Sequence, residues 1–290
     1  MFDPLNWAGD PALAWVLGAA TLYWLGGRHN QRRHPSAADR WRTTSFAAGL
    51  ATIVVALNSP IHGSADELLW VHMVQHILLV LVAPPLLALA RPWNRMWHCL
   101  PLGFRRPTAR MVAQSPRLAP LRRIAHLLGE PVPSWLLFNV TFVAWHLPVA
   151  YDATLDSQPI HVLEHATFFG TALLFWTRVI DSPPWRSALG DVGRAIYVGL
   201  ALVVSWVLAI VLALATSPLY APYADQAGQP GGISALADQH LAAGMMWVPG
   251  SIPFTIAIVF LAYRWLEPTQ ALPPSGDTRP VGGSPGRERR

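Results

Sequence analysis

Seven apolar stretches, each close to the length of a membrane-crossing helix, take up most of this 290-residue chain. A helix needs about 20 predominantly apolar residues to cross the hydrocarbon core of a bilayer. Because backbone polar groups find no water there, such stretches satisfy their hydrogen bonds most simply as helices. The sequence therefore predicts an all-α integral membrane bundle of seven transmembrane helices, with spans at about 11–27, 43–58, 68–90, 134–150, 160–180, 195–216 and 236–265.

The composition favours one membrane domain over two soluble ones. Only 13% of the residues are charged and 52% are hydrophobic, whereas soluble domains carry about 25% charged residues. We expect residues 1–266 to form the transmembrane domain. Residues 267–290 are rich in Pro, Gly and Arg, which is typical of a disordered tail.

The basic residues predict the orientation of the bundle. All 21 are arginines, and they lie in or beside alternate segments between the apolar stretches. The N-terminal residues and segments 58–67, 151–159 and 217–235 carry acidic residues but no arginine. The positive-inside rule then places the N-terminus outside and the C-terminus in the cytoplasm of a bacterial inner membrane. This distribution explains the net charge of +5 without a nucleic-acid partner.

The longest basic segment, 91–133, leaves two structures open. Arg123, Ile124, Leu127 and Leu128 have the spacing of a short amphipathic helix on an anionic lipid surface. A plain basic loop is the alternative, and the sequence does not decide between them. Prolines predict irregularities elsewhere: a bend of the third span at residues 84–85, and a kink or break of the seventh at residues 249 and 253.

The histidines are distributed unevenly between the two sides. Four of the eleven fall in cytoplasmic basic segments, and seven fall in outer segments or in the outer parts of spans: His62, His72, His76, His146, His161, His165 and His240. Ionisable side chains within a span are costly, and they usually face the bundle interior or an aqueous cavity. This asymmetry is the main functional signal in the sequence.

Two histidine pairs have the same spacing of four residues. His72 and His76 share one face of the third predicted helix, about 6 Å apart along its axis. His161 and His165 repeat this arrangement on the fifth helix, where Glu164 lies beside them and could orient a ring. Two such pairs at matching depth indicate a metal or cofactor site.

Further ligand candidates come from the neighbouring predicted helices. A short outer connection joins the fourth and fifth helices, and it brings His146 to the depth of the second pair. On the seventh helix Asp238 and Met245 share a face, with Asp238 placed to orient a ring, whereas His240 points away and is the weaker candidate. Imidazole and thioether groups bind Cu(I), and imidazole also binds Cu(II). The single cysteine, Cys99, excludes a paired-thiol site within the chain.

Four motifs, in order along the chain, resemble the CtaG family, the membrane assembly factors of caa3-type cytochrome c oxidase. They are HMVQHILLVLVAPPLLALARP (72–92), WHLPVAYDATL (145–155), HVLEHATFFGTALLFW (161–176) and DQHLAAGMMWVPG (238–250). The resemblance implies a seven-helix protein that helps mature the haem–copper oxidase by supplying or stabilising copper. Its implied partners are an oxidase subunit and a periplasmic copper donor. The implied metal residues are His72, His76, His146, His161, His165, Asp238, Met245 and Met246.

Three other functions use the same histidines. A membrane haem protein would ligate iron axially, although one haem needs only one histidine per helix. A membrane zinc hydrolase would need three histidines and a general base, and no carboxylate is clearly placed for that role. A copper permease would need ligands across the whole bilayer, which the cytoplasmic halves of the spans lack. We expect a binding protein without enzymatic turnover.

Overall fold

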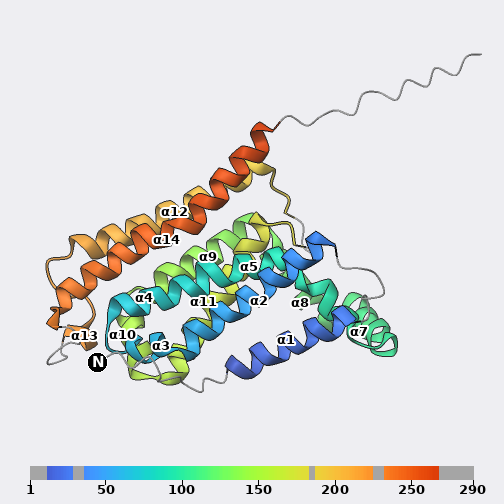
Figure 1. Ribbon diagram of the computed structural model, residues 1–290, viewed down its shortest axis with the longest axis horizontal. Helices are drawn as coiled ribbons and strands as arrows, with labels where there is room; N and C mark the ends of the chain where they lie inside the picture. Colours follow the sequence, from blue (N-terminus) through green and yellow to red (C-terminus); the bar gives the residue numbers. More distant parts are fainter. Residues whose placement is uncertain (1–11, 29–35, 183–186, 225–231, 268–290) are drawn as a thin grey trace, which may run out of the picture.

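The computed structural model describes residues 12–28, 36–182, 187–224 and 232–267, and these residues form an all-helical structure (Figure 1). The predicted tail, 267–290, lies almost entirely outside the described residues. The α-helices are α1 Ala12–Arg28, α2 Ala37–Asn58, α3 Pro60–Ala65, α4 Leu69–Ile77, α5 Ala83–Ala90, α6 Pro92–His98, α7 Leu102–Gln114, α8 Ala119–Gly129, α9 Pro131–Trp145, α10 Pro148–Asp156, α11 Gln158–Val179, α12 Asp191–Leu214, α13 Ala221–Ala224 and α14 Ala235–Leu266. A π-helical segment, η1 Leu78–Val82, joins α4 to α5, and a 3₁₀ turn, η2 Pro116–Leu118, precedes α8.

The long helices run side by side along the long axis of the molecule (Figure 1). Helices α12 and α14 pack against each other, and α14 also packs against α4. Helix α11 packs against α9 and α5, and α2 packs against α5. Helix α1 lies on the side of the bundle opposite to α12 and α14, where it contacts α6. The core of the bundle is therefore shared by α4, α9, α11, α12 and α14.

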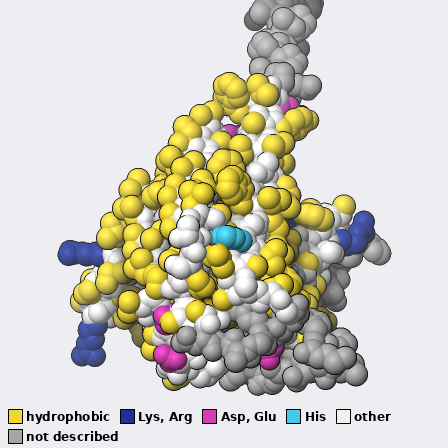
Figure 2. Space-filling model, turned by 90° about the vertical axis from the view of Figure 1, so that its left-hand side faces the viewer, with side chains coloured by type: hydrophobic (Ala, Val, Ile, Leu, Met, Phe, Trp, Pro, Cys, Tyr) yellow, Lys and Arg dark blue, Asp and Glu magenta, His cyan; other side chains and the backbone are white. Residues whose placement is uncertain are grey.

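The short helices separate the two ends of the bundle. Helices α3, α10 and α13, which belong to the segments without arginine, lie together at one end, and α7 and α8 lie toward the other (Figure 1). Figure 2 views the molecule from the end that holds α3, α10 and α13. Acidic side chains lie on the face toward the viewer, and basic side chains lie only at its margins. This charge separation has the pattern from which the orientation was predicted. The orientation itself stays a prediction.

Fewer helices qualify as membrane spans than the seven predicted from the sequence. Within the described residues, three are long and apolar enough by length and composition, Leu69–Ala90, Asp191–Leu214 and Ala235–Leu266. A fourth is added if Pro116–Gly129 and Pro131–Trp145, which meet at 82°, form one broken span. Helix α1 has only 17 residues, and α11 carries the polar residues of the candidate site. The structure thus supports a membrane protein with three to four clear spans, and the other spans stay predictions.

The basic segment after α6 is helical rather than an irregular loop. Helix α8 exposes Leu121, Ile124 and Leu127, spaced three residues apart along one side. It contains Arg122 and Arg123, and none of its residues is buried. The structure therefore has the amphipathic helix that the sequence left as one of two alternatives.

The third predicted span contains a π turn directly after His76. Pro84 has no N–H, so it cannot donate to the carbonyl of Val80 four residues earlier. That carbonyl instead accepts a hydrogen bond from the indole of Trp176 on α11, at 3.1 Å. The N–H of Ala83 reaches back five residues to Leu78. The predicted irregularity at the prolines thus takes the form of a π segment whose freed carbonyl is paired, a feature frequent near functional sites.

Helix α14 tests one part of the prediction made from its prolines, the break. It runs as one helix from Ala235 to Leu266, with Pro249 and Pro253 inside it. The sequence predicted a kink or a break there, and the structure has no break. Ordinarily an internal proline removes a helical hydrogen bond and disfavours the helix by about 3 kcal/mol. Here α14 packs extensively against α12 and α4, and this packing holds the helix on both sides of the prolines.

A glycine on α1 permits close contact between α1 and α6. A Cβ atom at Gly26 would lie 1.9 Å from the backbone oxygen of Arg95, so the two helices would have to separate. We expect Gly26→Ala to destabilise the protein by about 1–3 kcal/mol, measured by thermal unfolding in detergent. Gly18 on the same helix has open space around its Cβ position. Gly18→Ala is the control, and it should be neutral or stabilising by up to about 1 kcal/mol. Equal effects of the two changes would contradict the close contact.

Candidate metal site

The first turn of α4 is held by an acidic residue from α14. Both oxygens of Asp238 accept hydrogen bonds from backbone N–H groups, at 2.8 Å from Leu69 and 3.1 Å from Trp70. The first N–H groups of a helix have no partner within the helix, and the preceding residue, Leu68, provides no side-chain cap. Asp238 thus fixes the start of α4, one turn before His72.

Four side chains from α4 and α11 meet in the interior of the bundle. His72, His76, Glu164 and His165 each offer one ligand atom, and these atoms all lie within 4.8 Å of one another. The Nε2 atoms of His72 and His76 are 2.9 Å apart. Their distances to the Glu164 oxygens are 3.7 and 3.6 Å. We refer to these four residues as the His–Glu cluster.

The cluster leaves several buried polar atoms without a hydrogen bond. Glu164 is 0% exposed, and neither carboxylate oxygen has a hydrogen-bond partner among the described residues. The same holds for Nε2 of His165 and Nδ1 of His76. Buried polar groups in native proteins are nearly always paired, so a group of orphans at one point indicates a missing ligand. Three imidazoles and one carboxylate fit divalent copper or zinc.

Buried tyrosines fix the tautomer of His72. Tyr223 on α13 donates its hydroxyl hydrogen to the carbonyl of Ala65, at 2.8 Å. Its oxygen lies 3.4 Å from Nδ1 of His72, and it can then only accept a hydrogen from that nitrogen. Burial raises the pKa of the Tyr223 hydroxyl above its ordinary value, so the group stays a neutral phenol. A protonated Nδ1 leaves His72 with its lone pair on Nε2, which faces Nε2 of His76 at 2.9 Å and is the atom that a metal would use.

His161 lies next to the cluster rather than within the four-residue group. Its ring centre is 4.3 Å from that of His165 and 5.3 Å from that of His72. On its other side it stacks with His62, at 5.9 Å. Gln75 holds His62 by donating to its Nδ1 at 3.1 Å and also donates to a backbone carbonyl. His161 and His62 thus extend the row of imidazoles toward α3.

His146 approaches the cluster from α9. Its ring centre is 6.1 Å from that of His76. Its Nδ1 lies 2.7 Å from the carbonyl oxygen of Phe142, which can only accept, so Nδ1 carries the hydrogen. The backbone carbonyl of His146 accepts from the hydroxyl of Tyr220 at 3.0 Å. The ring is therefore fixed with its Nε2 lone pair directed into the protein.

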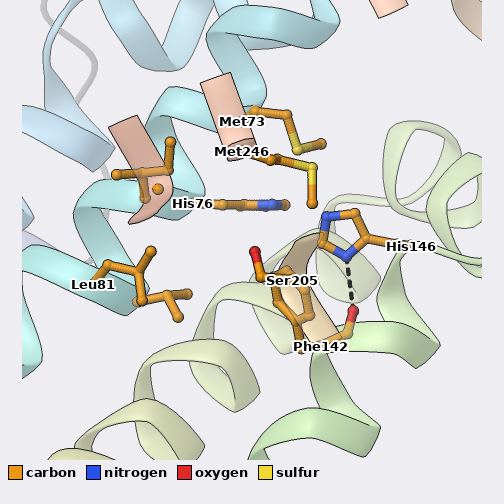
Figure 3. A pocket seen from close by; sticks show the side chains of 10 residues that line it. Met73, His76, Leu81, Phe142, His146, Ser205 and Met246 are labelled. Carbon is orange, nitrogen blue, oxygen red and sulfur yellow. Dashed lines mark hydrogen bonds between the residues drawn. The ribbon is translucent and has the colours of Figure 1, made fainter. Parts of the chain in front are cut away.

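The residues predicted on the seventh helix occupy three different environments. Asp238 uses both oxygens to cap α4 and lies outside the His–Glu cluster. Met246 lines a cavity next to His76 (Figure 3). Met245 does not line this cavity, although both methionines pack in the same apolar cluster. The exposed ring of His240 lies 3.2 Å from the carbonyl of Ala215, away from the site.

Sequence reasoning missed the residues that support the imidazoles. Tyr151, Tyr220 and Tyr223 form a buried group over the cluster, and Gln75 orients His62. A tyrosine in a short connection carries no periodic signal. The only sequence clue was the position of all three tyrosines in the outer segments without arginine.

Comparison with known families gives one match across most of the chain. The family model described as cytochrome c oxidase caa3 assembly factor matches residues 21–268. The match covers the four motifs and all the residues of the His–Glu cluster. It confirms the resemblance seen in the sequence.

Three mycobacterial proteins are similar to the chain, and none has a characterised function. Uncharacterized proteins of Mycobacterium bovis and Mycobacterium tuberculosis are each 25% identical over 268 residues, which is 91% of this chain and 39% of the relative. An uncharacterized protein of Mycobacterium leprae is 23% identical, over 88% of this chain and 38% of the relative. The chain thus spans about two fifths of the length of these relatives. No solved structure matches.

Proposed function

Because the chain belongs to the family of caa3 cytochrome c oxidase assembly factors, we propose that it holds copper at the His–Glu cluster for transfer to the oxidase. Copper in this role is cargo, and the protein needs no catalytic residue. The proposal combines the assembly role of the family with the chemistry of one buried group of side chains.

One observation carries the proposal: the fully buried carboxylate of Glu164 has no hydrogen-bond partner in the described structure. An ionised carboxylate in an apolar interior costs several kcal/mol unless a cation compensates it. Imidazole nitrogens of His72, His76 and His165 surround it, and they are good ligands for copper. A bound Cu²⁺ would supply the missing charge and satisfy the free lone pairs.

The place of the cluster in the bundle supports delivery on the outer side of a bacterial inner membrane. Helix α13, whose Tyr223 contacts His72, lies with α3 and α10 at the end without arginines. With the predicted orientation, that end faces the periplasm. A periplasmic copper donor and an oxidase subunit are the partners that this arrangement fits. We expect no nucleic-acid partner.

The two alternative ligands differ in how well they fit. Zinc would accept the same three imidazoles and carboxylate. Haem fits poorly, because the cavity beside His76 measures only about 20 Å³, which is room for about one water. Metal analysis with a visible spectrum separates all three ligands.

The test is metal content after loading with Cu(II) in mild detergent and removal of the excess. We expect about one Cu(II) per chain in the unmodified protein, and loss of it in a His72→Ala/His165→Ala variant, because two of four ligands are gone. His240→Ala is the control, since this exposed histidine lies outside the cluster. A Soret band, selective retention of zinc, or copper bound equally by the double variant would overturn the proposed site.

A further inference from the structure

The cavity beside His76 lies apart from the His–Glu cluster, on the side facing α9, α12 and α14. It measures about 20 Å³, and its lining includes Met73, His76, His146, Ser205 and Met246. Figure 3 shows the thioethers of Met73 and Met246 on one side of the space between the His76 and His146 rings. We refer to this space as the thioether cavity. It is large enough for about one water or one metal ion.

His146 provides an unpaired nitrogen at this cavity. The residue is 4% exposed, and its Nε2 has no hydrogen-bond partner in the described part of the chain. Because Nδ1 is held by the Phe142 carbonyl, Nε2 carries a lone pair and no hydrogen. A buried imidazole lone pair without a donor lacks the pairing that buried polar groups normally find. A bound cation would satisfy it.

The two methionines supply soft donors from different helices. Met73 on α4 is 1% exposed and Met246 on α14 is 4% exposed, so both sulfurs are shielded from solvent. Buried methionines usually only fill space. Here both line the cavity that His146 faces, whereas the adjacent Met245 does not. Two thioethers and an imidazole are a ligand set that selects Cu(I).

The charge of the lining also favours a monovalent ion. Among the described residues no carboxylate lines the thioether cavity, whereas the His–Glu cluster contains Glu164. The cost of burying an ion rises steeply with its uncompensated charge. Neutral ligands therefore suit only a singly charged cation, whereas the three imidazoles and the carboxylate of the cluster can hold either Cu(I) or a divalent ion.

We propose that the thioether cavity is a second metal site, which binds Cu(I) through His146, Met73 and Met246. His76 lies at both sites, and its one lone pair can serve one ion at a time. The proposal rests on the proposed function. Because His76 belongs to both sites, a Cu(I) ion can pass between them by exchanging the other ligands in turn, with no change of oxidation state. The thioether cavity lies closer to α12 and α14 than the His–Glu cluster does.

The test is Cu(I) binding under anaerobic, reducing conditions, titrated against a chromophoric Cu(I) chelator and followed by X-ray absorption at the copper edge. We expect about two Cu(I) per chain in the unmodified protein, with a sulfur contribution to the spectrum. A Met73→Leu/Met246→Leu variant should bind about one and lose the sulfur signal. Leucine conserves volume, and such changes usually cost less than about 1.5 kcal/mol each, so the variant should fold.

Two matched variants distinguish a failure of the thioether site from a failure of the proposed function. Met245→Leu removes a thioether next in sequence but outside the cavity, and it should leave both ions and the sulfur signal. His72→Ala/His165→Ala should lose one ion and keep the sulfur signal. Unchanged Cu(I) binding in the Met73/Met246 variant, or no sulfur signal in the unmodified protein, would overturn the second site. Failure of the His72/His165 variant to lose an ion would instead overturn the proposed function and leave the thioether site standing.

Discussion

Glu164→Gln is expected to raise the melting temperature of the metal-free protein while it weakens Cu(II) binding by roughly 100-fold or more. The rise in melting temperature and the fall in copper affinity have the same cause, the loss of the carboxylate. Without metal, the buried carboxylate lacks hydrogen bonds and is 3.6–3.7 Å from the nearest imidazole nitrogens. Neutralising it removes a desolvation cost, which we expect to stabilise the protein by about 1–3 kcal/mol. With metal, the same change removes a ligand, and even partners outside the ligand shell contribute about 10–100-fold to affinity.

The measurement pairs thermal unfolding of metal-free protein with Cu(II) titration of the same samples. Glu130→Gln is the control, because it neutralises an exposed acid at the end of α8. That variant should change neither the melting temperature nor the copper affinity appreciably. A lower melting temperature for metal-free Glu164→Gln, with copper affinity unchanged, would mean that Glu164 has a structural role only.

Asp238→Ala should destabilise the protein by roughly 2–5 kcal/mol, because it leaves two backbone N–H groups of α4 without their acceptor. The turn that follows carries His72, so copper affinity should fall together with stability. Asp238→Asn keeps one carbonyl oxygen as an acceptor. We therefore expect an intermediate loss of stability and a folded variant that still binds copper at full stoichiometry.

The pair of variants separates a capping role from a ligand role. If Asp238 were a copper ligand, the asparagine variant would lose the ion with little change in stability. Thermal unfolding and copper content, measured on the same preparations, decide between the two roles. Asp156→Ala on α10 is the control, since this exposed acid lies at the same end of the bundle. It should stay within about 0.5 kcal/mol of the unmodified protein.

The periodic part of the site could be predicted from the sequence. A spacing of four residues places two side chains on one helical face whatever the helix packs against. His72 and His76 accordingly meet, and His165 faces them from α11. Glu164 was expected only to orient a ring, yet its carboxylate lies among the candidate ligand atoms. The difference arises because the sequence does not show how far α11 rotates toward α4.

The remaining contacts depend on segments without a period. Tyr223 lies on a four-residue helix whose position follows from its packing, and Asp238 and Leu69 are 169 residues apart in the chain. Hydropathy predicted seven spans, of which three or four qualify by length and composition among the described residues. The others stay predictions, because the arginines separate apolar stretches without showing whether each one is long enough to cross a bilayer. The predicted α-helical class and the family resemblance were both confirmed.

The π turn between α4 and α5 has a consequence for how the site can vary. One residue added to a helix rotates everything beyond it by about 100°. The segment Leu78–Val82 therefore sets the angular phase between the half that carries the imidazoles and the half that packs against α2. The apolar residues of the two halves therefore need not form one continuous stripe along the helix. The half that carries the imidazoles can thus change its facing without disturbing the half that packs against α2, so a one-residue insertion or deletion in this turn would change the direction in which the imidazoles point.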